Sequence, residues 1–192
     1  GALALCLYSA RLVDEAHDGD AEAQALLDLL TPIVKAWPSD YALAANDIAI
    51  QVLGGAGYTR DFPVERLWRD NRLNAIHEGT NGIQALDLLG RKILGDGGKA
   101  LGLLARRVVG TLERAGADAS LALHAKALQE WLPAIQQAVA AAATREGSEV
   151  ALANAYLLLD ALGHFLVAWL WLEQALVARR GLARDGVPDA KR

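Results

Sequence analysis

One carboxylate in this chain stands where it could act as an acid or a base. Glu78 follows an arginine-rich segment and comes two residues before Thr80, a favourable N-cap residue for a helix. A carboxylate that removes a proton from carbon must be held close to its target and partly desolvated, which raises its pKa toward neutrality. The same residue could instead only stabilise the positive end of the helix. Its position alone does not decide between these two roles.

The glycines at positions 54, 55 and 57 raise the question of nucleotide binding. A dinucleotide-binding turn needs a third glycine and a preceding strand, and neither is found around Gly57. The residues before the glycines predict a helix, so the expected structure is a helix C-cap followed by a turn. Backbone N–H groups of this turn and the Gln51 side chain could still touch the phosphates or adenosine of a cofactor that is bound mainly elsewhere.

The remaining reactive or charged side chains favour structural roles. The arginines between positions 60 and 72 are nearly balanced by Asp61, Glu65 and Asp70, which predicts a salt-bridge network rather than an anion site. His164 follows Asp160 by four residues on an apolar helix, a pairing that would satisfy a core histidine. No cluster has the ligand spacing of a zinc site, so no metal is expected. Cys6 lies in an apolar helix and is expected to be an inert core thiol.

Composition excludes several classes of protein. The chain has 192 residues, of which 53% are hydrophobic, and this predicts a globular fold rather than disorder. A net charge of −4 gives no electrostatic reason to expect a nucleic-acid partner. The single cysteine is compatible with a reducing compartment, and we expect a cytoplasmic location. The longest uncharged run of the final predicted helix, residues 161–172, is too short for a membrane span, so none is expected.

Helical periodicity accounts for almost the whole chain, and no segment alternates over the length of a strand. Pro32 should kink or restart its helix, and Pro38 should open a further one. The fold class is therefore predicted to be all-α, an antiparallel helical bundle. The main helices are expected over residues 2–17, 20–37, 38–53, 80–94, 99–115, 118–145 and 149–184.

A glycine-rich run at residues 95–98 is the clearest internal boundary. It divides the chain into a helical bundle over residues 1–95 and an additional helical unit over residues 96–192. On the helix that begins after Thr80, helical spacing predicts that Ile83, Leu86, Leu89 and Ile93 face the core.

An ordered series of short motifs in the first unit resembles the acyl-CoA dehydrogenase family. The motifs lie between residues 51 and 84 in the order QVLGG, GY, PVER, RD and EGTNGIQ. The series is far more specific than any one of its parts. This resemblance implies the C-terminal helical bundle of a flavoenzyme that removes two hydrogens from a fatty acyl-CoA.

The resemblance also implies a role for each matched residue. Glu78 would be the catalytic base that takes the substrate α-proton while the β-hydride passes to FAD, and its backbone N–H would polarise the thioester carbonyl. Gly79 would lie against the substrate. The implied FAD contacts are Thr80 and Asn81 in one subunit and, toward the FAD of a neighbouring subunit, Gln51, Val52, Leu53, Gly54 and Gly55. The implied partners are a second copy of the chain, as a homodimer or a higher homo-oligomer, and electron-transfer flavoprotein or another electron acceptor.

Residues after 95 resemble, more loosely, the extra C-terminal helical domain of large bacterial acyl-CoA dehydrogenases, including those that act on 3-methylmercaptopropionyl-CoA. The segments 76–92 and 163–175 carry this likeness. The family's N-terminal helical domain and middle β-barrel are not present. We therefore expect a C-terminal fragment that is inactive alone and binds FAD weakly or not at all. The alternatives are a non-catalytic helical interaction or oligomerisation domain and an acyl-CoA oxidase.

Overall fold

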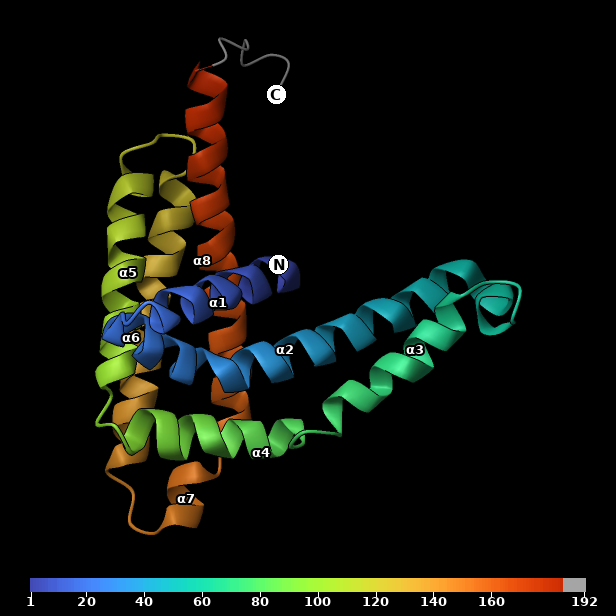
Figure 1. The fold of residues 1–192 in the computed structure, drawn as a ribbon, viewed down its shortest axis with the longest axis horizontal. Helices are drawn as coiled ribbons and strands as arrows, with labels where there is room; N and C mark the ends of the chain where they lie inside the picture. Colours follow the sequence, from blue (N-terminus) through green and yellow to red (C-terminus); the bar gives the residue numbers. More distant parts are fainter. Residues whose placement is uncertain (185–192) are drawn as a thin grey trace.

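The computed structural model describes residues 1–184, and every regular element in this range is a helix (Figure 1). The predicted all-α fold class is therefore confirmed. Helices α5, α6 and α8 lie side by side, and α1, α2 and α4 cross them. The α-helices are α1 (Ala2–His17), α2 (Ala21–Leu53), α3 (Val64–Arg72), α4 (Asn81–Leu86), α5 (Lys99–Gly116), α6 (Ala122–Ala143), α7 (Ser148–Leu152) and α8 (Ala155–Arg184).

Helix α2 begins where the sequence predicts but does not end there. Asp20 caps it by accepting the backbone N–H groups of Glu22 and Ala23 at 2.8 and 3.1 Å. The helix then continues through Pro32 and Pro38 to Leu53, so the prediction of a further helix at Pro38 is wrong. Each proline removes one backbone hydrogen bond. Burial of the residues around both prolines keeps the turns on either side packed in the core.

The second half of α2 leaves the core and forms an arm with α3 (Figure 1). Every buried residue of α2 lies between Ala23 and Ser39. Beyond this point large apolar side chains face solvent, and Ile48 and Val52 are 63% and 80% exposed. Short helical turns, η1 (Gly54–Tyr58) and η2 (Leu73–Ala75), flank α3 and return the chain to the body of the molecule.

Helix α4 runs directly into a π-helical segment, η3 (Asp87–Leu94), which places a different face inward from the one predicted. Leu89 and Ile93 are buried as expected, but Ile83 and Leu86 are exposed. Within residues 1–184, α4 packs mainly on α2 and α8, and Ile83 and Leu86 lie on the side of α4 that faces solvent. The predicted turn at residues 95–98 is present, and Asp96 accepts the backbone N–H groups of Gly98 and Ala100.

Buried side chains from residues before and after position 95 form one continuous cluster, in which Leu26, Leu30 and Ile33 of α2 join Leu159, Leu162 and Leu166 of α8. The division of the chain into two units at this position stays a prediction. The single helix expected over residues 149–184 is broken, because α7 ends at Leu152 and α8 starts at Ala155.

Two residues expected in the core lie at the surface. Cys6 is exposed on α1. The His164 side chain is 52% exposed, and its Nδ1 atom lies 3.7 Å from the Asp160 carboxylate. Both helices are apolar on several sides, so periodicity did not identify the side that packs.

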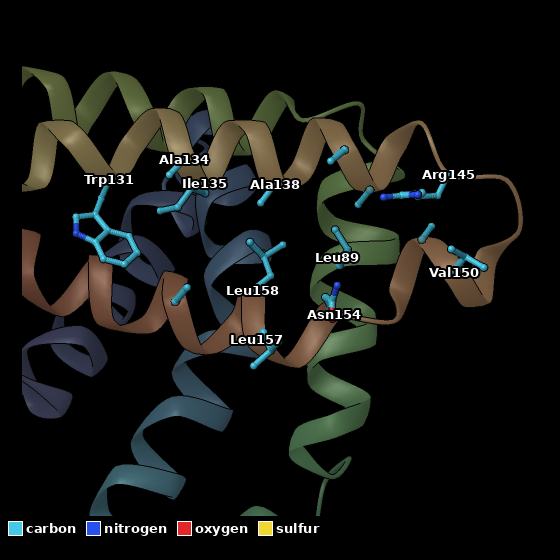
Figure 2. A pocket seen from close by; sticks show the side chains of 14 residues that line it. Leu89, Trp131, Ala134, Ile135, Ala138, Arg145, Val150, Asn154, Leu157 and Leu158 are labelled. Carbon is cyan, nitrogen blue, oxygen red and sulfur yellow. The ribbon is translucent and has the colours of Figure 1, made fainter.

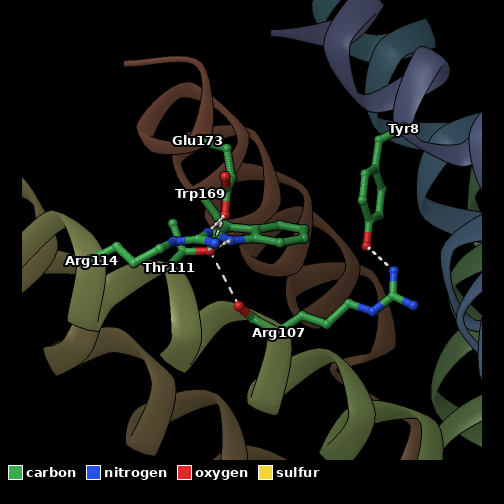
Figure 3. A network of polar contacts seen from close by, with 6 residues as sticks. All are labelled: Tyr8, Arg107, Thr111, Arg114, Trp169 and Glu173. Atoms are coloured by element: carbon green, nitrogen blue, oxygen red, sulfur yellow. Dashed lines mark hydrogen bonds and ion pairs between the residues drawn. The ribbon is translucent and has the colours of Figure 1, made fainter. Parts of the chain in front are cut away.

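A polar network joins α5 to α8 and runs from the apolar core to the surface (Figure 3). Thr111 is completely buried, and its hydroxyl oxygen accepts the indole N–H of Trp169 at 2.8 Å. The same hydroxyl contacts the Glu173 carboxylate, which also pairs with Arg114. Burial of the Thr111 hydroxyl and the Trp169 indole N–H is tolerated because each has a hydrogen-bond partner.

Candidate functional site

Glu78 occupies the short turn between η2 and α4 in a left-handed backbone conformation. Its φ of 56° makes it the one non-glycine residue with positive φ among residues 1–184, and Gly79 follows with φ 82°. This conformation costs an L-residue roughly 1–2 kcal/mol. Such residues persist where neighbouring contacts fix them, and they concentrate at functional sites.

Contacts from two helices hold this turn in place. The Lys35 ammonium, from α2, donates to the Gly79 carbonyl at 2.7 Å and to Asn81 Oδ1 at 3.1 Å. From α4, the Gln84 amide donates to the Glu78 carbonyl at 3.0 Å. Thr80 caps α4 as predicted, because its hydroxyl oxygen accepts the Ile83 N–H at 3.4 Å. The carbonyl groups of Glu78 and Gly79 are therefore both anchored.

Asn81 anchors the start of α4 to α2. The residue is 6% exposed, and its amide nitrogen donates to Asp40 Oδ1 at 2.7 Å and to the Ser39 hydroxyl at 3.0 Å. Because its amide oxygen accepts from Lys35, both polar ends of the side chain are occupied. A FAD contact from Asn81 would have to use its backbone or replace one of these bonds, and this contact stays a prediction.

The Glu78 side chain is exposed, but it lines a concave surface rather than a convex one. An open cavity of about 320 Å³ lies beside it between α2 and the segment that returns from α3. Within residues 1–184 the walls do not bury the carboxylate, so the desolvation expected for a base is not supplied by this part of the chain. The other lining residues are Lys35, Pro38, Ser39, Ala42, Asn71, Asn74 and His77.

A row of amide side chains leads from α2 to His77 beside the base. Asn71 donates to Asn46 Oδ1 at 3.1 Å, Asn74 donates to Asn71 Oδ1 at 2.7 Å, and His77 Nε2 lies 3.3 Å from Asn74 Oδ1. Sequence reasoning missed this row and the role of Lys35. The spacing of three residues from Asn71 to Asn74 to His77 was a usable signal, because it places all three on one helical face.

The segment predicted to reach a neighbouring FAD lies far from Glu78. Gln51, Val52, Leu53, Gly54 and Gly55 are all exposed at the tip of the arm. The turn of α2 near Asn81 is about 15 residues away, a separation of roughly 20 Å along the helix. The two sets of residues predicted to contact FAD therefore lie apart within one chain. This separation is expected if one set contacts the FAD of its own subunit and the other contacts the FAD of a neighbouring subunit.

The backbone at the tip of the arm is open to solvent. Gly54 and Gly55 have no atoms within 4 Å of the position a Cβ would take, so a ligand can approach their backbone closely. The last turn of α2 carries the negative end of the helix dipole, which disfavours a pyrophosphate.

Other concave surfaces lie away from Glu78 and are apolar. One of about 420 Å³ lies between α6, α7 and α8, and Figure 2 shows Trp131, Ile135, Leu157 and Leu158 around it. No group of three or more His, Cys, Asp or Glu residues within 1–184 could hold a metal ion. Of the charges between residues 60 and 72, Arg69 pairs with Glu65 at 3.4 Å.

One stretch has the length and composition of a membrane span. The segment Ser148–Ala183 contains an 18-residue window of mean hydropathy 1.6, of which 44% is buried within the fold. A core helix of a water-soluble protein passes the same test, so this is weak evidence for a span. The expected absence of a membrane span stays a prediction.

The chain matches two family profiles that together cover almost all of it. Residues 2–94 match "Acyl-CoA dehydrogenase, C-terminal domain", and residues 104–191 match "Acetyl-CoA dehydrogenase C-terminal like". The chain belongs to the acyl-CoA dehydrogenase family.

Individual relatives agree with this assignment. The chain is 32% identical to the broad-specificity linear acyl-CoA dehydrogenase FadE5 of Mycobacterium tuberculosis, over 100% of this chain and 34% of that protein. It is 31% identical to the 3-methylmercaptopropionyl-CoA dehydrogenase of Ruegeria pomeroyi, over 97% and 33%. Caenorhabditis elegans ACDH-11, solved in complex with C11-CoA, superposes with a TM-score of 0.74 at 25% identity, over 92% of this chain and 31% of that one. The chain thus spans about a third of the length of these relatives.

Proposed function

We propose that this chain is the C-terminal part of a flavin-dependent acyl-CoA dehydrogenase in which Glu78 removes the α-proton of the acyl-CoA thioester. The observation that carries the proposal is the left-handed Glu78 beside a cavity, held by Lys35 and Gln84. A carboxylate that only stabilised a helix N-terminus would need neither the strained backbone nor the anchored turn.

The backbone of the same turn supports a second role. Within residues 1–184 the N–H groups of Glu78 and Gly79 donate to no protein acceptor, although the flanking carbonyls are both bonded. An unpaired N–H beside the base is available to the thioester carbonyl, and it would stabilise the negative charge that develops there as the α-proton leaves. FAD, when bound in the whole protein, would accept the hydrogen that leaves the β-carbon with its electron pair.

The exposed arm supports an oligomer as part of this function. Ile48, Val52 and Tyr58 present apolar surface to solvent at the arm tip, next to the glycines at positions 54 and 55. A second subunit packed on the arm would bury this surface and would bring the glycines to the partner's cofactor. The same exposed surface would also serve a non-catalytic interaction domain, which is the competing function.

Replacing Glu78 by glutamine in the whole, FAD-loaded protein separates these functions. Glu78→Gln keeps the shape of the side chain and removes the base, so we expect at least a roughly hundredfold slower reduction of the flavin by acyl-CoA under anaerobic conditions. Loss of the flavin absorbance after mixing is the measurement, and FAD content should be unchanged. The matched control is Glu113→Gln, an exposed glutamate on α5. Reduction at the normal rate in the Glu78 variant would refute the proposal and favour the interaction domain.

A further inference from the structure

A path of hydrogen bonds connects α8 to the turn that carries Glu78. Tyr156, in the first turn of α8, donates its hydroxyl to Asp40 Oδ2, and the other oxygen of Asp40 accepts the Asn81 amide at 2.7 Å. The amide oxygen of Asn81 accepts from Lys35, and Lys35 also holds the Gly79 carbonyl. Four polar side chains thus lead from α8 to the backbone beside Glu78.

Asp40 is the centre of this path because each of its oxygens has a different partner. Hydrogen bonds to a charged carboxylate are stronger than those between neutral groups, and two of them fix the plane of the carboxylate. The bond to Asp40, aided by partial burial, raises the pKa of Tyr156 to about 12. The hydroxyl therefore stays protonated, and remains a donor, throughout the neutral range.

The site has a specific need for such support. Glu78 and Gly79 both have positive φ, and a strained turn relaxes when its anchors are removed. Catalytic side chains must be held within about 0.5 Å of their working position. The anchor at Asn81 lies at the first residue of α4, directly after the Thr80 cap, so its movement would displace the whole turn.

We propose that Tyr156 is a positioning residue for Glu78, acting through Asp40 and Asn81. An effect of Tyr156 on catalysis rests on the proposed function of Glu78. The mechanical link, by which Tyr156 holds the turn at Glu78 through Asp40 and Asn81, can be measured without catalysis. Helix α8 lies after residue 95, outside the segment 51–84 that carries the family motifs. Through Tyr156 it would nevertheless help to hold the backbone turn that positions Glu78.

Amide exchange in the 192-residue chain tests the mechanical link. The N–H groups of Ile83 and Gln84 close the first turn of α4, so they report its opening. We expect Tyr156→Phe to speed their exchange by roughly threefold to tenfold, the effect of losing one partly exposed hydrogen bond to a charged group. Exchange at buried residues of α5, such as Leu104 and Val108, should not change.

Tyr41→Phe is the matched control for this substitution. Tyr41 donates its hydroxyl to Asp160 at 3.1 Å, on the neighbouring surface, but it is not bonded to Asp40 or Asn81. Unchanged exchange at Ile83 and Gln84 in Tyr156→Phe would overturn the proposal, and so would an equal acceleration in Tyr41→Phe.

A double substitution tests whether the effect passes through Asp40. In an Asp40→Asn background the charged acceptor is gone, so adding Tyr156→Phe should change exchange at Ile83 and Gln84 by less than about twofold. A full effect of Tyr156→Phe in that background would refute the path. Far-ultraviolet circular dichroism confirms that each variant is folded before exchange is measured.

Kinetics of the whole, FAD-loaded protein completes the test. Tyr156→Phe should lower kcat by roughly threefold or more while the KM for acyl-CoA stays within about twofold, because the base is displaced and the substrate contacts are kept. A raised KM at unchanged kcat, or no change in either, would overturn the positioning role. If Glu78→Gln were still active, the proposed function would fail instead, and the exchange experiments would still decide the mechanical link.

Discussion

Replacing Thr111 by valine perturbs the polar network between α5 and α8 without changing the shape of the core. Valine has nearly the volume of threonine and the same branching at Cβ, so no cavity is created. The substitution removes the oxygen that accepts the Trp169 indole N–H at 2.8 Å. Thr111 is fully buried and Trp169 nearly so, so water cannot replace the lost partner.

The expected cost follows from the group left without a partner. A buried donor that loses its acceptor costs about 1–3 kcal/mol. Glu173 loses the contact with the hydroxyl but keeps Arg114, so it adds little. For a chain of this size, 1 kcal/mol shifts Tm by roughly 2–4 °C. We therefore expect Thr111→Val to lower the free energy of unfolding by about 1–3 kcal/mol and Tm by about 2–12 °C.

Urea unfolding followed by circular dichroism measures this change, with the slope m required to stay constant. Thr31→Val is the matched control, because Thr31 is an exposed helical threonine whose hydroxyl donates to the Leu27 carbonyl at 2.7 Å. Its effect should stay within about 0.5 kcal/mol. In a Trp169→Phe background no indole N–H remains, so the cost of Thr111→Val should largely disappear. A Thr111→Val protein as stable as the parent, or an undiminished cost in that background, would refute the reasoning.

Two further predictions concern the turn around Glu78. Gly79→Ala should lower the free energy of unfolding by about 1–2 kcal/mol, because the alanine would have to adopt a left-handed backbone conformation and its Cβ would lie 3.0 Å from Gln84 Nε2. The control is Gly102→Ala on α5, where an added Cβ meets no atom within 4 Å. This substitution should leave the free energy of unfolding unchanged or raise it by up to about 1 kcal/mol. Equal effects in urea unfolding would show that the turn is not constrained. Tyr156 has a folded-state pKa of about 12, above the value near 10 of an unfolded tyrosine, so its stabilising contribution should be complete below pH 10 and lost as the pH rises toward 12. The ultraviolet titration of tyrosinate in the parent should show one phenol near pH 12 that Tyr156→Phe lacks, and a titration of the parent that ends near pH 10 would contradict the Asp40 contact.

Local signals in the sequence predicted much of the fold correctly. Asp20 and Thr80 cap their helices because a short polar side chain can reach the free N–H groups of the first turn, a contact that needs no distant partner. The turn at residues 95–98 was also readable, since consecutive glycines favour the positive φ found at Gly97 and Gly98. The FAD contacts of residues 51–55, the domain division and the chemistry of Glu78 stay predictions.

Properties that depend on distant neighbours were not predictable in this way. Pro38 would end an isolated helix, yet α2 continues because α1, α4 and α8 bury the turns around it. Cys6 and His164 lie on helices that are apolar on several sides, and only the packing partners determine which side is exposed. The same holds for Ile83 and Leu86 on α4.

The sequence by itself determined an all-α chain, the capped starts of α2 and α4, and the position of Glu78 within a family motif, because these depend on residues within a few positions of one another. Tertiary structure alone decided that Glu78 would adopt a left-handed backbone beside a cavity. Lys35 is 44 residues from the Gly79 carbonyl that it holds, and Tyr156 is 116 residues from Asp40. Hydrogen bonds across such separations form only when the helices that carry them pack together.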